Sequence, residues 1–190
     1  NKAKKINPHN SGILNNIGEI LFSINKREEA LSYFIDLTEL HPKYIMGWIN
    51  LAKSYQNAGL LDKSEDCYNK ALSIDPFNKI ANIGFCKLLG SLGRNNEAVA
   101  ILKVMSSGFP DEKIINTMYA ISLFEDGKES EALEVFDKLA NNFPNDKVIL
   151  HNQAVIQKNK KNYNESLKTA LKLEEIDSTS EITKALILEL

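Results

Sequence analysis

Small and apolar side chains recur along this chain with a period of 34 residues. The seventh and eleventh positions of each period carry mostly large apolar or aromatic side chains. Because residues four apart lie on one face of an α-helix, this spacing predicts an amphipathic helix in the first part of each period. The eighth and twentieth positions are small and predict close helix contacts: Gly18, Ala52, Cys86, Ala120 and Ala154, then Ala30, Ser64, Ala98, Ala132 and Ser166.

Prolines and glycines indicate where two helices end in each period. Every proline of the chain lies on the same 34-residue lattice, at Pro8, Pro42, Pro76, Pro110 and Pro144. Proline cannot continue a helix, so each should follow the end of a second helix. Gly59, Gly93 and Gly127 share the fifteenth position, which Asn25 occupies in the first period. Glycine or asparagine just past a helix favours a left-handed residue, so the first helix should end there.

Polar side chains that can cap helices occupy two places in the period. Those expected to cap second helices are Asp62, Asn96, Ser130 and Asn164, with Asp62 and Glu65 forming a capping box. Those expected to cap first helices are Asn10, Asn78, Asp146 and Ser180. The predicted units are helix-turn-helix repeats at 11–44, 45–78, 79–112, 113–146 and 147–180, with a partial repeat at 181–190 and the tail of a preceding repeat at 1–10.

A 34-residue period with small residues at places 8 and 20, an aromatic at place 24 and proline at place 32 resembles the tetratricopeptide repeat. The residues that match it best are Trp48, Leu51, Ala52, Tyr55, Gly59, Tyr68, Ala71 and Pro76. The resemblance covers residues 3–190 and implies an all-α fold, a single α-solenoid domain over residues 1–190 that stacks antiparallel helix pairs into a right-handed superhelix. The last full repeat departs from the pattern at Gln153, Gln157, Lys161 and Ala170.

The apolar stretch at residues 181–190 has no second helix to cover it. A helical repeat buries its apolar face only against its neighbours. We therefore expect the chain to be a piece of a longer array, and the alternative is end-to-end self-association through residues 181–190.

Composition and charge disfavour several function classes. The chain is 43% hydrophobic and 25% charged, with a formal net charge of −2 and only two arginines, Arg27 and Arg94. A nucleic-acid partner is therefore not expected, because phosphate binding needs an excess of cations. An RNA-binding helical solenoid is disfavoured for the same reason. No apolar run reaches the roughly 20 residues that span a bilayer, so we expect no membrane insertion and a cytoplasmic location.

The sequence offers no catalytic constellation. Cys67 and Cys86 lie in no CxxC motif, and His9, His41 and His151 stand apart from one another. No nucleotide-binding, metalloprotease or nucleophile-elbow motif is present. We therefore expect a protein that is not an enzyme, with no catalytic, cofactor-binding or metal-binding residue.

The family resemblance implies a concave groove lined by first helices through places 2, 5, 6, 9 and 12 of each repeat. In repeats three to five these places are unusually apolar, which favours an extended or amphipathic helical ligand. The competing interpretation is that some of these side chains only pack against neighbouring helices. The candidate groove residues are Ile80, Ile83, Lys87, Ile114, Met118, Ile121, Phe124, Val148, His151, Asn152 and Val155.

The predicted function is a non-catalytic scaffold that binds a protein or peptide in this groove. The places that grip a C-terminal carboxylate in one tetratricopeptide subfamily carry unsuitable residues in every frame, so that mode is excluded. The alternative is the targeting arm of a larger enzyme, such as a glycosyltransferase-like protein. It is suggested by a partial asparagine ladder, Asn16, Asn50 and Asn152, that resembles the substrate-guiding arm of a sugar transferase.

Overall fold

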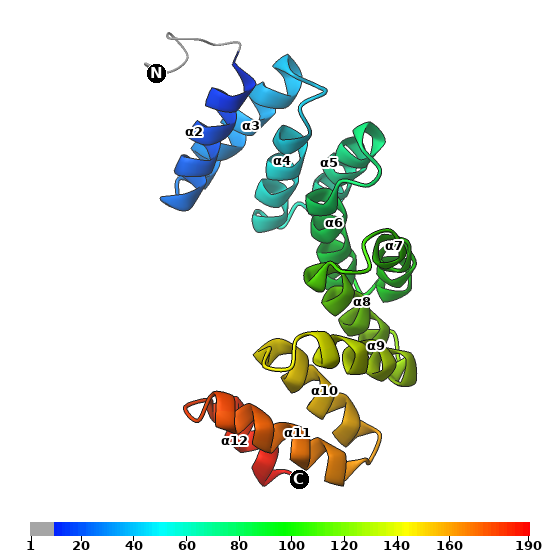
Figure 1. Ribbon diagram of the computed structural model, residues 1–190. Coiled ribbons are helices and arrows are strands. Elements are labelled where there is room, and N and C mark those ends of the chain that lie inside the picture. The colour runs from blue at the N-terminus through cyan, green and yellow to red at the C-terminus, as the bar shows by residue number, and fades with distance from the viewer. Residues whose placement is uncertain (1–9) are drawn as a thin grey trace. The chain divides into compact units, whose positions relative to one another are not determined.

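The computed structural model describes residues 10–190, and the regular structure in this range is entirely α-helical (Figure 1). The predicted tail at 1–10 lies outside the described residues except for Asn10. The helices are α2 (Ser11–Ser23), α3 (Arg27–Leu40), α4 (Ile45–Asn57), α5 (Leu61–Ile74), α6 (Lys79–Ser91), α7 (Asn95–Gly108), α8 (Lys113–Glu125), α9 (Glu129–Asn142), α10 (Lys147–Asn159), α11 (Tyr163–Ile176) and α12 (Glu181–Leu188).

Every full repeat consists of a first helix of 13 residues and a second helix of 14. The first helices begin at the residues where the sequence lattice starts each repeat: Ser11, Ile45, Lys79, Lys113 and Lys147. The prediction of an all-α solenoid of antiparallel helix pairs is confirmed.

The chain forms two compact units that divide between Leu92 and Gly93. Helices α2 to α6 belong to the first unit and α7 to α12 to the second. Within each unit every helix packs against the next one, and successive first helices also touch, as α2 does α4 and α8 does α10. The single domain over residues 1–190 and the right-handed superhelix stay predictions.

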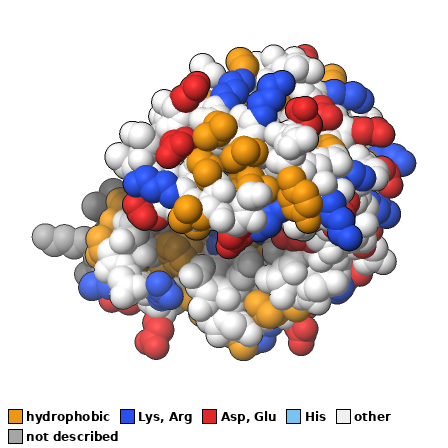
Figure 2. Space-filling view, turned by 90° about the horizontal axis from the view of Figure 1, so that it is seen from below, with side chains coloured by type: hydrophobic (Ala, Val, Ile, Leu, Met, Phe, Trp, Pro, Cys, Tyr) orange, Lys and Arg blue, Asp and Glu red, His pale blue; other side chains and the backbone are white. Residues whose placement is uncertain are grey.

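Helix α12 packs against α11 and leaves apolar side chains open to solvent. Ile182 and Leu188 of α12 are 69% and 87% exposed, and Leu167 and Leu171 of α11 are also exposed. Figure 2 looks onto the molecule from the side where α11 and α12 lie in Figure 1 and shows hydrophobic side chains gathered there, with lysines and carboxylates around them. This end of the second unit therefore presents an apolar surface.

The small residues at places 8 and 20 are buried in every full repeat. All five residues at place 20 have 0% exposure, and all five at place 8 are buried. A Cβ atom built on Gly18 would overlap the ring of Phe34, the place-24 aromatic of the same repeat. The two helices of a repeat thus approach closely because these side chains are small.

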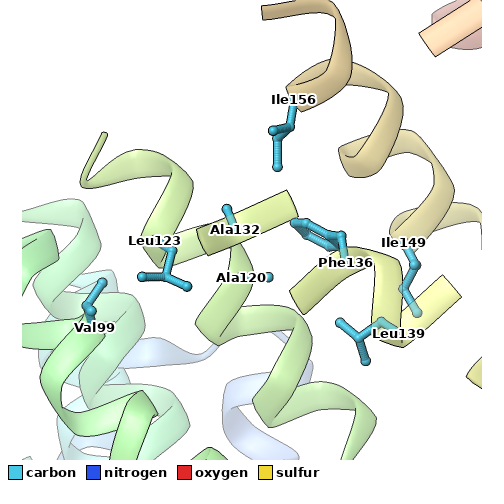
Figure 3. Packing of buried hydrophobic residues seen from close by; sticks show 8 residues of the cluster. All are labelled: Val99, Ala120, Leu123, Ala132, Phe136, Leu139, Ile149 and Ile156. Atoms are coloured by element: carbon cyan, nitrogen blue, oxygen red, sulfur yellow. The ribbon is translucent and has the colours of Figure 1, made fainter. Parts of the chain in front are cut away.

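The core of the second unit is organised around Phe136, which occupies place 24 of its repeat (Figure 3). It packs with Ala120 and Ala132, the small residues of the same repeat, and with Ile149 and Ile156 of the following helix. In the first unit Phe34 and Tyr68 occupy the same place and are 2% and 1% exposed. The aromatic column therefore joins one repeat to the next.

The first helices end as predicted, at a left-handed residue. Gly59, Gly93 and Gly127 have φ values of 74°, 72° and 78°, and Asn25 has 64°. The turn after α8 is a Schellman motif, because the Lys128 N–H donates to Leu123 O and the Gly127 N–H to Phe124 O. Lys161 adopts the same conformation with φ 62°, although it carries a side chain.

Helix caps agree with the prediction at first helices only. Side chains at the four predicted positions, Asn10, Asn78, Asp146 and Ser180, accept backbone N–H groups of the helices that follow. The predicted caps of second helices are wrong, because Asp62, Asn96, Ser130 and Asn164 each lie second within their helix. The N-cap residues are Leu60, Arg94, Lys128 and Asn162, with no side-chain cap.

The Schellman turn accounts for that error. The Lys128 N–H closes the end of α8, and the Lys128 carbonyl accepts the Ala132 N–H that opens α9. One residue therefore ends the first helix and begins the second, so the second helix starts before a polar side chain is reached.

A further contact fixes the connection between repeats. The residue at place 4 donates a hydrogen bond to the carbonyl of the proline six residues earlier in three repeats: Trp48 Nε1 to Pro42 O at 2.7 Å, Asn82 Nδ2 to Pro76 O at 2.9 Å, and Asn116 Nδ2 to Pro110 O at 2.8 Å. An indole in one repeat and a primary amide in two others thus donate to the equivalent proline carbonyl.

Replacing Lys161 by glycine should stabilise the second unit. The left-handed conformation costs an ordinary L-residue roughly 1–2 kcal/mol, part of which glycine loses again as chain entropy. We expect Lys161→Gly to raise the free energy of unfolding by about 0.5–1 kcal/mol in urea titrations. The neighbouring control Lys160→Gly, at φ −73°, should give no gain. Equal effects of both substitutions would contradict the explanation.

The two serines of place 20 should respond differently to alanine. Ser166 Oγ donates to Ala154 O at 2.7 Å, whereas Ser64 Oγ is buried without a partner. Ser166→Ala should lower the free energy of unfolding by about 1 kcal/mol, and Ser64→Ala should leave it unchanged or raise it by up to about 1 kcal/mol. Thermal or urea unfolding of both variants measures this. A larger loss at Ser64 would show that its hydroxyl is bonded.

Candidate functional site

The predicted groove residues all lie on first helices but belong to both units. Ile80, Ile83 and Lys87 lie on α6 in the first unit. The remaining eight lie on α8 and α10 in the second unit: Ile114, Met118, Ile121, Phe124, Val148, His151, Asn152 and Val155. All eleven are at least partly exposed, so each has some surface accessible to a ligand.

Place 2 carries the most exposed apolar side chains of this set. Ile80 is 48% exposed, Ile114 58% and Val148 56%. In the second unit, Ile114 and Val148 lie in the first turns of α8 and α10, which touch each other. Ile182 holds the same place in α12 and is 69% exposed. Ile182 was not among the predicted groove residues, although the 34-residue period makes it equivalent to Ile114 and Val148.

A cavity of about 210 Å³ lies where α10, α11 and α12 meet. Three predicted residues, Val148, His151 and Asn152, line it together with Leu173 of α11 and Ile182 of α12. Lys147, Asp177, Ser180 and Thr183 complete the lining, so the wall area is mostly apolar with several polar groups among the aliphatic side chains. Asn152 Nδ2 donates to Val148 O at 2.7 Å, which fixes the amide on its own helix.

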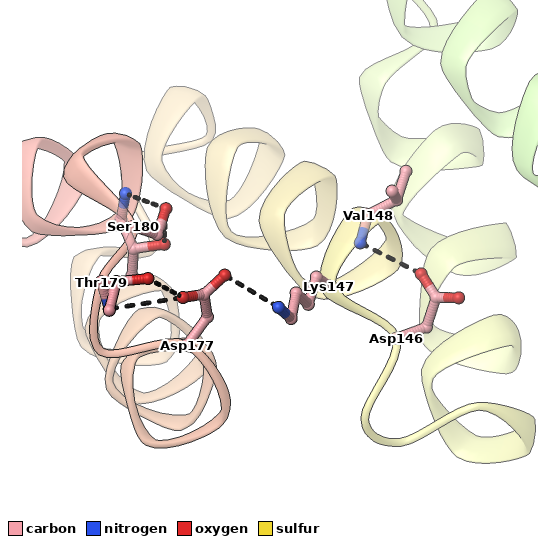
Figure 4. A network of polar contacts seen from close by, with 7 residues as sticks. Asp146, Lys147, Val148, Asp177, Thr179 and Ser180 are labelled. Atoms are coloured by element: carbon pink, nitrogen blue, oxygen red, sulfur yellow. Dashed lines mark hydrogen bonds and ion pairs between the residues drawn. The ribbon is translucent and has the colours of Figure 1, made fainter.

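An ion pair lies at the rim of this cavity (Figure 4). Lys147 Nζ lies 2.8 Å from Asp177 Oδ2, and Asp177 Oδ1 accepts from the Thr179 hydroxyl at 2.8 Å. The hydrogen bonds from Lys147 and Thr179 hold the pKa of Asp177 below its usual value. The pair thus fixes the start of α10 to the end of α11.

The preceding repeat also pairs the lysine at place 1 with an aspartate, although this aspartate comes from a different place of its repeat. Lys113 Nζ lies 2.7 Å from Asp146 Oδ2, and the other carboxylate oxygen caps α10 by accepting the Val148 and Ile149 N–H groups. Burial opposes ionisation of Asp146, but these hydrogen bonds outweigh it and its pKa is lowered. Place 1 is therefore occupied by a structural lysine in both repeats.

Three predicted residues also pack against the core. Ile121 and Phe124 lie against the cluster around Phe136, and Val155 lies against the cluster of Ala154, Ala170 and Leu186. Their apolar character thus has a structural cause, as the competing interpretation of the groove supposed. Ile114 and Val148 belong to neither cluster and are mostly open to solvent.

One residue of the asparagine ladder, Asn50, is engaged in contacts within the first unit. Asn50 Nδ2 donates to Asn15 Oδ1 at 2.8 Å and to Glu19 Oε1 at 2.9 Å, and Asn50 and Asn15 are 6% and 5% exposed. This network links α2 to α4. Asn16, the ladder residue of the first repeat, is exposed and takes no part in it.

Both cysteines lie in the core as free thiols. Burial raises the pKa of the Cys67 thiol to about 11 and that of the Cys86 thiol to about 12, so both are protonated at neutral pH. Over residues 10–190, no three His, Cys, Asp or Glu side chains are grouped closely enough to hold a metal ion. None of the helices in this range combines the length and the apolar composition needed to cross a bilayer.

Comparison with curated proteins gives matches to short stretches of this chain. A stretch of 74 residues is 32% identical to human Protein O-mannosyl-transferase TMTC3, covering 39% of this chain and 8% of that protein. Another of 77 residues is 32% identical to Anaphase-promoting complex subunit 3 of Dictyostelium discoideum, covering 40% of this chain and 8% of that protein. The chain therefore spans less than a tenth of either relative.

Comparison with solved structures gives matches over nearly the whole chain. YrrB, a TPR protein with an unusual peptide-binding site, matches all of this chain and 97% of its own with a TM-score of 0.77 at 20% identity. MamA of Desulfovibrio magneticus RS-1 matches 90% of this chain and 97% of its own with a TM-score of 0.79 at 14% identity. At these identities the likeness shows the fold alone.

Family models of the tetratricopeptide repeat match residues 11–44, 45–78 and 118–146, which together make up about half of the chain. The first two matches begin and end where the sequence period places its first two repeats, and the third ends with the fourth repeat. The chain belongs to the tetratricopeptide repeat family.

Proposed function

We propose that this protein is a non-catalytic scaffold that binds an extended or helical segment of a partner protein on the first helices of its second unit. The observation that carries the proposal is the row of exposed apolar side chains at place 2, Ile114, Val148 and Ile182, beside the 210 Å³ cavity. Apolar side chains that gather on a surface commonly mark an interaction site.

The fold itself is one that supports protein–protein interaction and is typically non-catalytic. The peptide-binding site of YrrB, which has the same fold, adds support. The partner is expected to be a protein or peptide rather than a nucleic acid, since the net charge of −2 gives no general attraction to phosphates. A cytoplasmic location stays a prediction.

The cavity suits one aliphatic or aromatic side chain of the partner. Val148, Leu173 and Ile182 supply apolar walls, and His151 and Asn152 supply polar groups for the adjoining backbone. Burying one such side chain contributes about 1.5–3 kcal/mol, whereas association costs about 4–15 kcal/mol. Several anchors along α8, α10 and α12 are therefore needed, and micromolar or weaker affinity is expected.

The groove residues of the first unit form a separate candidate. Ile80, Ile83 and Lys87 occupy places 2, 5 and 9 of α6, and Ile80 is exposed, although less so than its counterparts in the second unit. We propose that they offer a ligand the same combination of apolar contact and rim charge.

A second function has one observation in its favour. The match to Protein O-mannosyl-transferase TMTC3 supports the alternative that this solenoid is the targeting arm of a larger enzyme. The complete coding sequence tests this: a catalytic domain in the same chain would support the arm, and its absence would contradict it.

Self-association through residues 181–190 is favoured by the exposure of Ile182 and Leu188. If it occurs, sedimentation velocity will show a mass that increases with concentration, and Leu188→Ser will abolish the increase because it removes the most exposed apolar side chain. A chain that stays monomeric at all concentrations would contradict the hypothesis.

The binding surface can be tested with peptides selected against the whole chain from a random display library. The double variant Ile114→Ser, Val148→Ser should bind them at least about tenfold more weakly, the equivalent of roughly 1.4 kcal/mol, with an unchanged melting temperature. Val104→Ser is the matched control, since Val104 is 58% exposed on a second helix of the same unit. Equal binding by both variants would refute the proposal.

A further inference from the structure

A polar cleft of about 510 Å³ lies in the second unit between the second helices α9 and α11. Helix α10, which packs against both, contributes Gln153 and Gln157 to its lining (Figure 1). Asp137 lies on the α9 wall, and Lys168, Thr169 and Lys172 lie on the α11 wall. The cleft shares no lining residue with the cavity beside Val148.

The cleft exists where the fifth repeat departs from the other four. Places 7, 11 and 23 carry apolar or aromatic residues in repeats one to four, and Gln153, Gln157 and Thr169 in the fifth. The equivalents are Leu51, Tyr55 and Cys67 in the second repeat, and Tyr119, Leu123 and Val135 in the fourth. Three lattice columns that converge on one cleft thus become polar together, while the small columns at places 8 and 20 are kept.

The two glutamines leave hydrogen-bonding groups open to the cleft. Gln157 is only 7% exposed, and its Oε1 accepts from the Thr169 hydroxyl at 3.0 Å. Gln153 Nε2 donates to Asp137 Oδ1 at 2.7 Å. Within the described chain, Gln157 Nε2 and Gln153 Oε1 have no partner. A donor and an acceptor one helical turn apart complement the C=O and N–H groups of an extended backbone.

The α11 wall carries two lysines and one carboxylate, Glu165, and the facing α9 wall carries Asp137, whose Oδ1 accepts from Gln153. Lys168 and Lys172 lie four residues apart, and neither has a carboxylate within ion-pair distance in the part of the chain described. Other lysines of this unit, Lys113 and Lys147, are paired with aspartates. Glu165 lies in the first turn of α11, at one end of the wall.

From these contacts we infer that the cleft binds a short, extended, acidic peptide segment. The amides of Gln153 and Gln157 pair with its backbone, and its carboxylates reach Lys168 and Lys172. This site is distinct from the first-helix surface, because α10 presents Val148, His151 and Asn152 to one and the two glutamines to the other. Substitutions can therefore abolish binding at one surface and leave binding at the other intact.

The test titrates the whole ¹⁵N-labelled chain with three pools of capped hexapeptides, one acidic, one neutral and one basic. The acidic pool should shift the side-chain amide signals of Gln153 and Gln157, and the other pools should leave them in place. The double variant Lys168→Gln, Lys172→Gln should bind the acidic pool about fivefold more weakly. Its melting temperature should not change, because both lysines are exposed.

Two variants separate this site from the surface on the first helices. Filling the cleft with Gln153→Leu, Gln157→Leu and Thr169→Val should abolish binding of the acidic pool while keeping or raising the melting temperature. Ile114→Ser with Val148→Ser should leave that binding intact. The inference is overturned if the acidic pool moves neither glutamine signal, if the basic pool moves them equally, or if the double lysine variant binds as tightly as the parent.

Discussion

Close approach of the two helices of a repeat within one unit is the constraint on which the rest of the structure depends. The five residues at place 20 are completely buried whether they are alanine or serine, and place 8 accepts only glycine, alanine or cysteine. When side chains at the contact are small, helix axes come close and the larger residues beside them reach the neighbouring helices. Phe136 can then contact Ile149 and Ile156 of the next repeat. Each repeat is thus completed by the one that follows it.

The helix pairs could be predicted from the sequence because their determinants are local and repeat with the chain. Prolines, left-handed glycines and the caps of first helices each act within a few residues, so their positions translate directly into helix ends. The caps of second helices could not be predicted in this way. Asp62 has the chemistry of an N-cap, but the Schellman turn makes Leu60 the N-cap, so α5 has already begun at Leu61. The bonds to the proline carbonyls were also missed, since tryptophan and asparagine fill place 4 and no single residue type signals it.

The candidate surface could be predicted only in part, because exposure is set by neighbours from other repeats. Ile114 and Ile121 look equivalent in the sequence, both isoleucines on one first helix. Ile114 lies in the first turn and stays open to solvent, whereas Ile121 packs on the core of its unit. Spacing assigns both to the groove, and only the position of adjacent helices separates them. The cavity beside Val148 needs a third helix, α12, to close it.

The fifth repeat shows that the positions that set the backbone are separable from those that set the surface. Ala154 and Ser166 keep the small columns, and the helix pair has the same lengths as in the other repeats. Meanwhile Gln153 and Gln157 stand where other repeats are apolar, and Lys161 adopts the left-handed conformation reached by glycine elsewhere. A repeat with intact contacts at places 8 and 20 therefore tolerates polar residues in columns that are otherwise apolar. New binding chemistry can arise on this solenoid without a change in its fold, because the neighbouring repeats hold the helices in place.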